Sequence, residues 1–383
     1  MQPDQAPNEG YVLDAWWRRL PERPATAGLI ACCVLAYAAT VVGAVASSAE
    51  PLTTLTNSIW TLEGSEPILV KLGALDLTRV WLNDEWWRVA SAGLLHGFFL
   101  HLLLNLLALG SLGDWVEHAW GPWRTLLIFT LSSVTGCLAS LVWCESTIVV
   151  GASAGVLGLA GALWVSRQFA PPSIQERLEP VSSFSLGFLV LVCLILGAVI
   201  PWIAQAGHVG GLVMGLLLGA CLTTRFILRA VSAVAAGGLL AALVFFGSSP
   251  QWSPNYHQYL GLRSLSEGDT RTAIRHFQAA LELSPDHPQL LNTVAYQLAL
   301  DGEELEYAKG LAFRALYVEP ANPNFLDTLA WVLCRQGNPQ SAQPILSAAL
   351  YLAHEPVDEI ASHALSCAEG AAPLAPVSRE TLE

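Results

Sequence analysis

The stretch "VVGASAGVLGLAG", residues 149–161, places one hydroxyl group, that of Ser153, among glycines and alanines in an apolar run. Three interpretations compete. The small residues around Ser153 fit the nucleophile elbow of soluble hydrolases, in which a serine lies on a sharp turn between a strand and a helix. They also fit the spacing that lets two membrane helices pack closely. The third interpretation is a nucleophile within a membrane helix, where small neighbours leave room for a substrate.

Composition favours a membrane protein. Hydrophobic residues make up 53% of the 383 residues and charged residues 13%, whereas about 25% of a typical soluble domain is charged. Apolar runs near 20 residues predict spans at 27–46, 89–112, 123–143, 148–167, 184–204, 206–224 and 229–247. We therefore predict an all-α, polytopic membrane protein with seven spans, six being the alternative. The first span is too long and too far from the N-terminus for a cleavable signal peptide, so we expect it to be retained.

The distribution of arginine predicts the orientation of these spans. With seven spans, eight arginines near their ends fall on one side: Arg18, Arg19, Arg23, Arg124, Arg167, Arg177, Arg225 and Arg229. The long first loop on the other side, residues 47–88, carries Lys71, Arg79 and Arg88, but acidic residues outnumber basic ones there. Basic residues are enriched in cytoplasmic segments next to spans. We therefore expect the N-terminal segment, residues 1–26, in the cytoplasm of a bacterial cell with an inner-membrane location, and the C-terminus on the outer side.

Residues 254–356 follow a different pattern. The segments "AIRHFQAALELSPDHP" and "LEYAKGLAFRALYVEPANP" align so that Pro285 and Pro320 lie 35 residues apart, and "DTLAWVLCRQGNPQSAQPILSAALYLAHEP" repeats the layout. This resembles tetratricopeptide repeats, in which paired helices of about 34 residues stack into an α-solenoid that binds protein partners. An ordinary helical bundle is the alternative. Residues 254–383 hold 7 Lys or Arg against 16 Asp or Glu, which argues against nucleic-acid binding. The segment 357–383 is expected to end in a disordered tail.

A nucleophilic serine needs a base, and His208 is the candidate. It begins a span in "GHVGGLVMGLLLG", where Gly211, Gly215 and Gly219 recur every four residues and allow a close helix neighbour. The predicted topology runs the fourth and sixth spans in the same direction. Ser153 and His208 are therefore expected at matching depth, in the outer half of the membrane.

The second predicted span, with "HGFFLHLLLN", offers polar groups that could stabilise an oxyanion. His101 and Asn105 are four residues apart and share a helix face, while His96 is expected to point elsewhere. A metal site at these histidines is the weaker interpretation, because no carboxylate stands at ligand spacing. We therefore expect neither a metal nor another cofactor.

From about Leu69 to Gly219 the chain resembles the rhomboid family of intramembrane serine proteases. Five motifs of that family occur in order: Trp87-Arg88, His96-x4-His101-x3-Asn105, Gly113-x3-Glu117-x3-Gly121, Gly151-x-Ser153 with Gly161, and His208-x2-Gly211-x3-Gly215. The elbow interpretation is not supported, because nothing before Gly151 resembles the sheet of an α/β-hydrolase. The resemblance implies a six-helix membrane core over residues 27–247, here with one extra span.

The resemblance also implies roles for individual residues. Ser153 would attack a peptide carbonyl of a membrane-spanning substrate and His208 would act as base and then acid, without an aspartate. The oxyanion would be bound by His101, Asn105 and the Ser153 backbone N–H. The supporting residues implied are Gly151, which leaves space beside the nucleophile, His96, Trp87 and Arg88 in the first loop, and Glu117 as a structural hydrogen-bond partner.

Two departures from the family pattern stand out. Ala154 replaces the glycine that often follows the serine, and Leu157 replaces an aromatic that stacks on the histidine. If the missing ring loosens His208, Leu157→Tyr should raise activity or stability.

The rival function is a non-proteolytic membrane adaptor that binds clients through its core and repeats. Cys334 and Cys367 could pair outside the cytoplasm, but their spacing does not require it.

Overall fold

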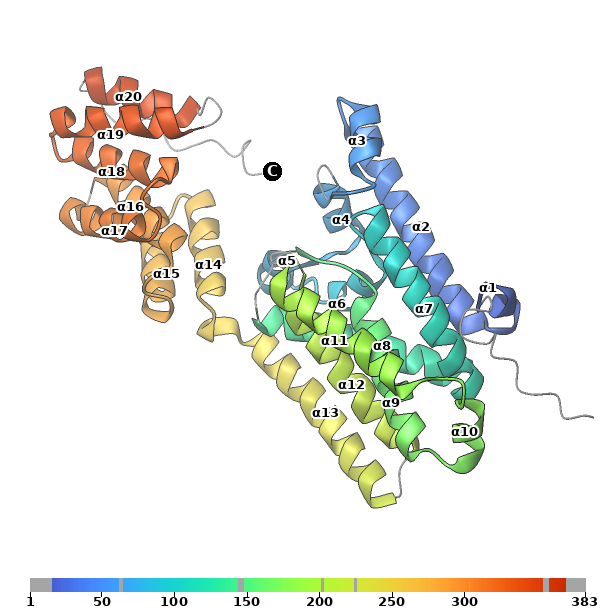
Figure 1. Cartoon of the computed structure of the whole chain (residues 1–383). Helices are drawn as coiled ribbons and strands as arrows, with labels where there is room; N and C mark the ends of the chain where they lie inside the picture. The colour runs from blue at the N-terminus through green and yellow to red at the C-terminus, as the bar shows by residue number, and fades with distance from the viewer. Residues whose placement is uncertain are drawn as a thin grey trace, which may run out of the picture. The chain divides into compact units, whose positions relative to one another are not determined.

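The structure is a computed structural model that describes residues 16–61, 65–143, 148–200, 203–223, 226–302, 304–353 and 358–369 (Figure 1). The chain divides into two compact units, Met1–Ser249 and Pro250–Glu383. Both are built from helices. Within the described ranges the only strands are β1 (Leu75–Asp76) and β2 (Ile148–Val149), which pair antiparallel.

The helices of the first unit follow one another with short connections. Before the site they are α1 (Trp16–Arg19), η1 (Leu20–Glu22), α2 (Pro24–Ser47), α3 (Pro51–Asn57), α4 (Glu66–Leu72), α5 (Leu77–Asn83), α6 (Arg88–Ser91), η2 (Ala92–Leu94), α7 (Phe99–Trp120) and α8 (Pro122–Trp143). After β2 come α9 (Ser153–Phe169), α10 (Pro172–Arg177), α11 (Ser183–Val199), α12 (Gln205–Thr223) and α13 (Phe226–Ser248).

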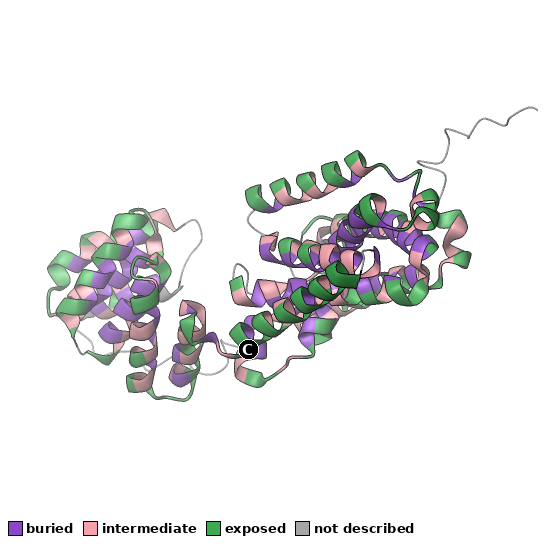
Figure 2. Ribbon diagram, turned by 90° about the horizontal axis from the view of Figure 1, so that it is seen from below, coloured by how far each residue is buried: buried purple, intermediate pink, exposed green. Residues whose placement is uncertain are grey.

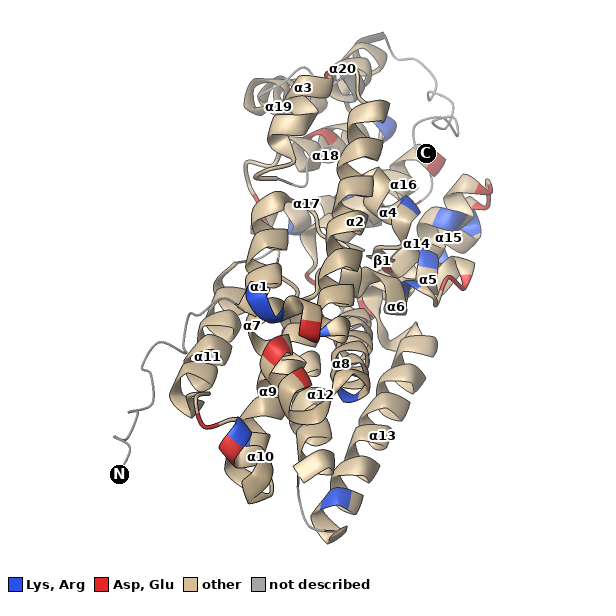
Figure 3. Ribbon diagram, turned by 90° about the vertical axis from the view of Figure 1, so that its right-hand side faces the viewer, with Lys and Arg blue, Asp and Glu red and all other residues tan. Residues whose placement is uncertain are grey.

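Five of these helices, α2, α7, α8, α12 and α13, are long and apolar enough to cross a membrane. Two more of the predicted spans are α9 and α11, each of 17 residues, or about 25 Å at 1.5 Å per residue. Little of the apolar length of α2 and α13 is buried, and exposed residues line the outer faces of this unit (Figure 2). Charged residues are scarce along the long helices (Figure 3). The chain is thus an all-α, multi-pass membrane protein.

Two predicted spans had wrong bounds. The span expected at 89–112 is the helix α7, Phe99–Trp120, because Phe98 is extended and residues 88–94 form the short α6 and η2. The span expected at 148–167 begins at Ser153, because Ile148 and Val149 form β2 and Gly151 has a positive φ of 131°. A hydropathy average joins short apolar turns to the helix that follows them, so it misplaces helix starts.

The helices α9 and α12 pack backbone against backbone through glycine, as the sequence predicted. A Cβ atom on Gly211 would overlap the Ala154 carbonyl, and one on Gly215 would overlap the Gly158 carbonyl. Because these partners advance together along both helices, α9 and α12 run parallel with their N-terminal ends level. Figure 1 shows the two helices beside each other.

The motif around Glu117 joins α7 to α2. The Glu117 carboxyl accepts hydrogen bonds from the N–H groups of Ala25 and Thr26 at 3.0 and 2.8 Å and from the Thr26 hydroxyl at 2.8 Å. These N–H groups belong to the first turn of α2, where helical donors lack intrahelical partners. A Cβ atom on Gly113 would lie 2.8 Å from the Thr26 hydroxyl oxygen, so glycine permits this approach. Glu117 therefore caps α2.

The two ends of the first unit can be told apart by contacts. At one end, Trp120 of α7 donates to Ser166 near the end of α9 at 3.3 Å. At the other end, Gly151 donates to Ala92 at 3.1 Å, and Trp81 of α5 donates from Nε1 to the carbonyl of Gly247 at 3.0 Å. The last helix of the unit, α13, therefore ends on the face that contains the start of α9.

The second unit consists of paired helices. They are η3 (Pro250–Trp252), α14 (Pro254–Ser266), α15 (Thr270–Leu283), α16 (Pro288–Asp301), α17 (Leu305–Val318), α18 (Pro323–Arg335), α19 (Pro339–Leu352) and α20 (Asp358–Glu369). Prolines 254, 288 and 323 each begin a pair and lie 34 and 35 residues apart. Alanines, leucines and Phe277 fill the core between the pairs.

The final helix, α20, forms the first part of the C-terminal segment, residues 358–369. A disulfide joins Cys334 of α18 to Cys367 of α20, with the two Cα atoms 5.7 Å apart. Buried His363 of α20 also contacts Asp327 of α18 through Nδ1 and Oδ2 at 2.8 Å. Residues 370–383, where the tail is expected, lie outside the described residues.

Candidate active site

The structure brings Ser153 and His208 together. Ser153 is the first residue of α9 and His208 lies in the first turn of α12, and the parallel packing of these helices places them at one level. His208 Nε2 and Ser153 Oγ are 2.9 Å apart, within hydrogen-bonding distance. Ser153 and His208 therefore lie at one level, as predicted, and contact each other directly.

The residues before Ser153 shape the space around it. Gly151 has a φ of 131°, a conformation that other residues rarely adopt. A Cβ atom there would lie 2.8 Å from Cε1 and Nε2 of His101 and 3.8 Å from Ser153 Oγ. The His101 ring thus lies over Gly151 and close to the serine, and only glycine leaves room for it.

Hydrogen-bond donors gather at the same place. The buried Asn105 side chain donates from Nδ2 to the His101 carbonyl at 2.9 Å, so it lies one turn further along α7 on the same face. The N–H of Ser153 belongs to the first turn of α9, where N–H groups have no intrahelical acceptor and the helix dipole is positive. The His101 ring and the start of α9 therefore bring potential donors close to the Ser153 hydroxyl, and Asn105 lies one turn beyond His101 on α7.

His96 does not point elsewhere, contrary to the sequence-based expectation. Its ring is completely buried and stands edge-on to the His101 ring, with centroids 5.0 Å apart and planes at 64°. The expectation assumed that residues 96–105 form one helix. Because α7 begins only at Phe99, the chain immediately before it is not helical, and His96 lies next to His101.

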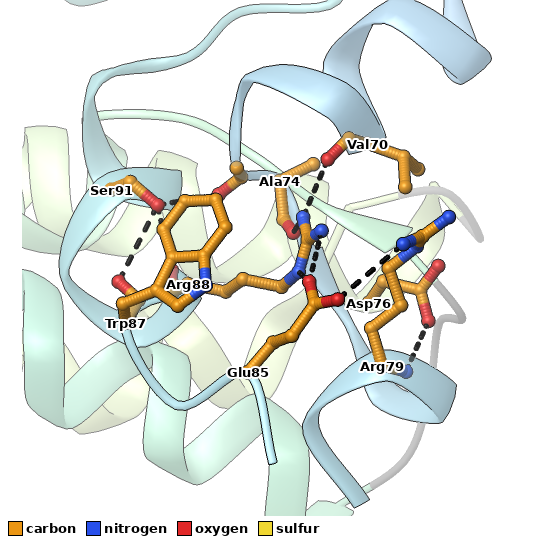
Figure 4. A network of polar contacts seen from close by, with 9 residues as sticks. Val70, Ala74, Asp76, Arg79, Glu85, Trp87, Arg88 and Ser91 are labelled. Carbon is orange, nitrogen blue, oxygen red and sulfur yellow. Dashed lines mark hydrogen bonds and ion pairs between the residues drawn. The ribbon is translucent and has the colours of Figure 1, made fainter. Parts of the chain in front are cut away.

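The Trp87-Arg88 pair organises the first loop (Figure 4). Arg88 is 2% exposed and donates to the carbonyls of Val70 and Ala74 at 2.6 and 3.0 Å and to the Glu85 carboxylate at 2.6 Å. The hydrogen bond from Arg88 lowers the pKa of Glu85. The neighbouring Trp87 is 53% exposed. Arg88 thus fastens the loop from within, while the Trp87 ring remains at its surface.

Leu157, the position that lacks the aromatic, is 2% exposed. A tyrosine there must displace its neighbours, and overpacking a filled core typically costs about 1–3 kcal/mol. We therefore expect Leu157→Tyr to lower the melting temperature in detergent, against the gain expected from sequence. Leu157→Met, which nearly conserves volume, is the control. A rise in melting temperature or cleavage rate for Leu157→Tyr would show that the site has room for the ring.

Two polar residues of the first unit were missed by sequence reasoning. Asp114 pairs with Arg19 and Arg23 at 2.5 and 2.8 Å, and a charged side chain within an apolar helix was a signal. Gln205 lies one turn before His208 on α12. Arg225, one of the arginines used to predict the orientation, lies outside the described residues. Within the described ranges no group of three or more His, Cys, Asp or Glu side chains is placed to hold a metal ion.

Comparison with known proteins gives a consistent result. Residues 83–225 match the family described as "Rhomboid domain". The chain is 37% identical over 157 residues to "RHOMBOID-like protein 4" of Arabidopsis thaliana, a match that covers 41% of this chain and 39% of that protein. It is 30% identical over 207 residues to "Rhomboid protease GluP" of Bacillus subtilis (strain 168), covering 52% and 38%.

A third relative, "Rhomboid protease AarA" of Providencia stuartii, is 28% identical over 179 residues, covering 41% of this chain and 63% of that protein. The matches thus span less than two thirds of the length of each of these relatives. The family match over residues 83–225 includes α7, α9 and α12, which carry the residues described above. Over residues 83–225, this multi-pass membrane protein is therefore similar to the rhomboid domain.

Proposed function

We propose that the protein is an intramembrane serine endopeptidase that cleaves membrane-spanning proteins with Ser153 and His208. The observation that carries the proposal is the 2.9 Å contact between His208 Nε2 and Ser153 Oγ. It joins two apolar helices, α9 and α12, whose backbones approach closely at Gly211 and Gly215. The rhomboid domain and the relatives named as rhomboid proteases support the same reaction class.

The chemistry follows from the placement of these groups. Ser153 Oγ attacks the carbonyl carbon of the scissile peptide while its proton passes to His208 Nε2. The carbonyl oxygen becomes an oxyanion, for which His101, Asn105 and the Ser153 N–H are the donors. The proton on Nε2 then passes to the leaving amine, which departs and leaves an acyl-enzyme. Water, deprotonated by His208, hydrolyses that ester and restores the serine.

The test is cleavage by the pure protein. We would reconstitute the full chain in liposomes with a panel of single-span substrates and identify the cut by mass spectrometry. We expect cleavage within or beside the substrate span, and a matched Ser185→Ala variant, which changes an exposed serine of α11, should cleave equally well. Client binding without any cleavage across the panel would instead favour the membrane adaptor.

Loss of an oxyanion donor should slow the reaction without removing the nucleophile. One such donor is typically worth about 100-fold or more in rate, so we expect Asn105→Ala and His101→Ala each to lower kcat by about 100-fold. Both variants should still be labelled at Ser153 by a small fluorophosphonate. Wild-type cleavage rates for both would remove α7 from the proposed site.

We further propose that the second unit is a tetratricopeptide-type domain on the outer side of a bacterial inner membrane, where it recruits protein partners or substrates. Helix pairs repeating at 34 and 35 residues support the repeat type. The end of α13 on the Ser153 face and the arginines at the opposite end support the orientation. The Cys334–Cys367 disulfide fits an oxidising compartment.

Topology and truncation test this second proposal. Reporters fused after Gly247 and after Glu383 should both report the outer side. Deleting residues 250–383 should leave cleavage of a generic substrate intact but slow cleavage of a native one, because a recruited client has a raised effective concentration near the site. Cytoplasmic signals from both fusions would mean that α13 does not cross, and recruitment on the Ser153 side would be excluded.

A further inference from the structure

The far side of the His208 ring faces a second buried polar group. While His208 Nε2 contacts Ser153, His208 Nδ1 is buried and makes no hydrogen bond of ordinary geometry to the described residues. The same is true of Oε1 of Gln205. Gln205 lies three residues before His208 in α12, so the two side chains occupy neighbouring positions on one helix face. A buried donor and a buried acceptor, neither with a hydrogen bond of ordinary geometry to the described residues, thus lie near each other.

Gly197 of α11 locates the space that these atoms share. A Cβ atom on Gly197 would overlap Gln205 Oε1 and lie 3.5 Å from His208 Nδ1. Both atoms therefore surround the one point where α11 has no side chain. This arrangement gives the amide oxygen of Gln205 access to the histidine.

The other end of the Gln205 amide is already fixed. Its Nε2 donates to the carbonyl of Leu194 in α11 at 3.1 Å. An amide nitrogen donates and an amide oxygen accepts, so this bond determines which end is which. The amide oxygen of Gln205 is therefore the atom that faces Gly197 and His208.

We propose that Gln205 is a positioning residue for His208: its Oε1 accepts a hydrogen bond from His208 Nδ1–H. This inference rests on the proposed protease function. Holding the proton on Nδ1 leaves the Nε2 lone pair directed at the Ser153 hydroxyl, the tautomer that a general base requires. The serine proton passes to Nε2 only, and Gln205 exchanges no proton. A neutral amide thereby fills the orienting role that aspartate has in catalytic triads.

A second acceptor near His208 must be distinguished from Gln205. The backbone carbonyl of Cys193 in α11 also faces the His208 ring. His101 of α7 is the nearby titratable group from the remaining side of the site. A change of the Gln205 side chain leaves the Cys193 carbonyl in place. Variants at position 205 therefore separate the two acceptors.

The experiment uses the full chain in liposomes with the single-span substrate panel. Gln205→Met removes the acceptor at similar length, and Gln205→Glu keeps one. Gly197→Ala displaces the amide oxygen without removing it, so it provides a second variant should Gln205→Met fold poorly. Gln168→Met is the matched control. Gln168 lies near the C-terminal end of α9, at the end opposite Ser153, and its exposed amide donates to the Ser183 hydroxyl. We would measure kcat, KM, the pH profile, fluorophosphonate labelling and the melting temperature.

We expect Gln205→Met and Gly197→Ala each to lower kcat and the labelling rate about tenfold, the effect of losing one hydrogen bond at the base, with KM unchanged. Gln205→Glu should retain activity and shift the acidic limb of the pH profile upward, because a carboxylate stabilises the imidazolium. Nitrogen NMR of the labelled histidine should report the Nδ1–H tautomer in wild type and a mixture in Gln205→Met.

Two results would overturn the inference while leaving the protease proposal intact. One is wild-type kcat and an unchanged pH profile in Gln205→Met, which would assign the role to the Cys193 carbonyl. The other is equal loss in the Met and Glu variants together with a lower melting temperature, which would make Gln205 purely structural. Absence of Ser153-dependent cleavage in the wild type would instead reject the protease proposal, and this inference with it.

Discussion

Replacing Ser153 or His208 with alanine is expected to lower cleavage by at least about 10³-fold, because nucleophile and base act as one unit and the loss of either removes nearly the whole benefit of both. The two side chains contact each other at 2.9 Å from adjacent helices, and neither caps a helix or joins an ion pair in the described structure. The variants should therefore fold and insert normally. Initial rates in liposomes and melting curves in detergent measure the two effects separately.

Fluorophosphonate labelling adds a readout that does not depend on substrate choice. Ser153→Ala should lose labelling completely, and His208→Ala should be labelled very slowly, because its serine lacks a base. The matched Ser185→Ala variant should behave as wild type. Turnover within tenfold of wild type in Ser153→Ala would reject the dyad, however the other variants behave.

The second large effect is expected from a single methyl group between α9 and α12. A Cβ atom at Gly215 would overlap the Gly158 carbonyl, a backbone atom that cannot rotate away. Gly215→Ala must therefore move the helices apart and with them Ser153 and His208. A misplacement near 1 Å can cost about 100-fold in rate, and we expect a loss of at least that size together with a lower melting temperature.

The control is Gly237→Ala in α13, where a Cβ atom would meet nothing within 4 Å. It should be neutral in activity and neutral or slightly stabilising. Gly211→Ala, which overlaps the Ala154 carbonyl next to the nucleophile, should be at least as damaging as Gly215→Ala. Full activity in both variants would mean that the helices tolerate separation and that their close packing does not set the geometry of the site.

Sequence alone predicts the membrane helices well, because a span needs about 20 apolar residues whatever it packs against. It also predicts the glycine face of α12, since a repeat every four residues is a local pattern. It fails at the starts of α7 and α9. Those starts depend on the extended backbone of Phe98 and the positive φ of Gly151, which a hydropathy average cannot detect.

In the site, too, some features could be predicted from the sequence and others could not. Ser153 and His208 could be paired in advance, because both lie at the starts of spans that were predicted to run in one direction. The contact between His96 and His101 could not, since it depends on where α7 begins. Gln205 was missed because its relevance comes from Gly197, a residue on another helix whose only contribution is the absence of a side chain.

The capping of α2 by Glu117 has a consequence for biosynthesis. The N–H groups of Ala25 and Thr26 leave the ribosome 92 and 91 residues before the carboxyl that binds them. Until α7 is synthesised, the start of α2 must find its acceptors in water or lipid headgroups. Burying a carboxyl without hydrogen-bond partners in the membrane costs free energy. The Glu117 carboxyl can therefore become buried only when the N–H groups of Ala25 and Thr26 are already in place. Assembly therefore has an order: α2 is inserted first with its N-terminal N–H groups uncapped, and Glu117 caps them only after α7 has been inserted.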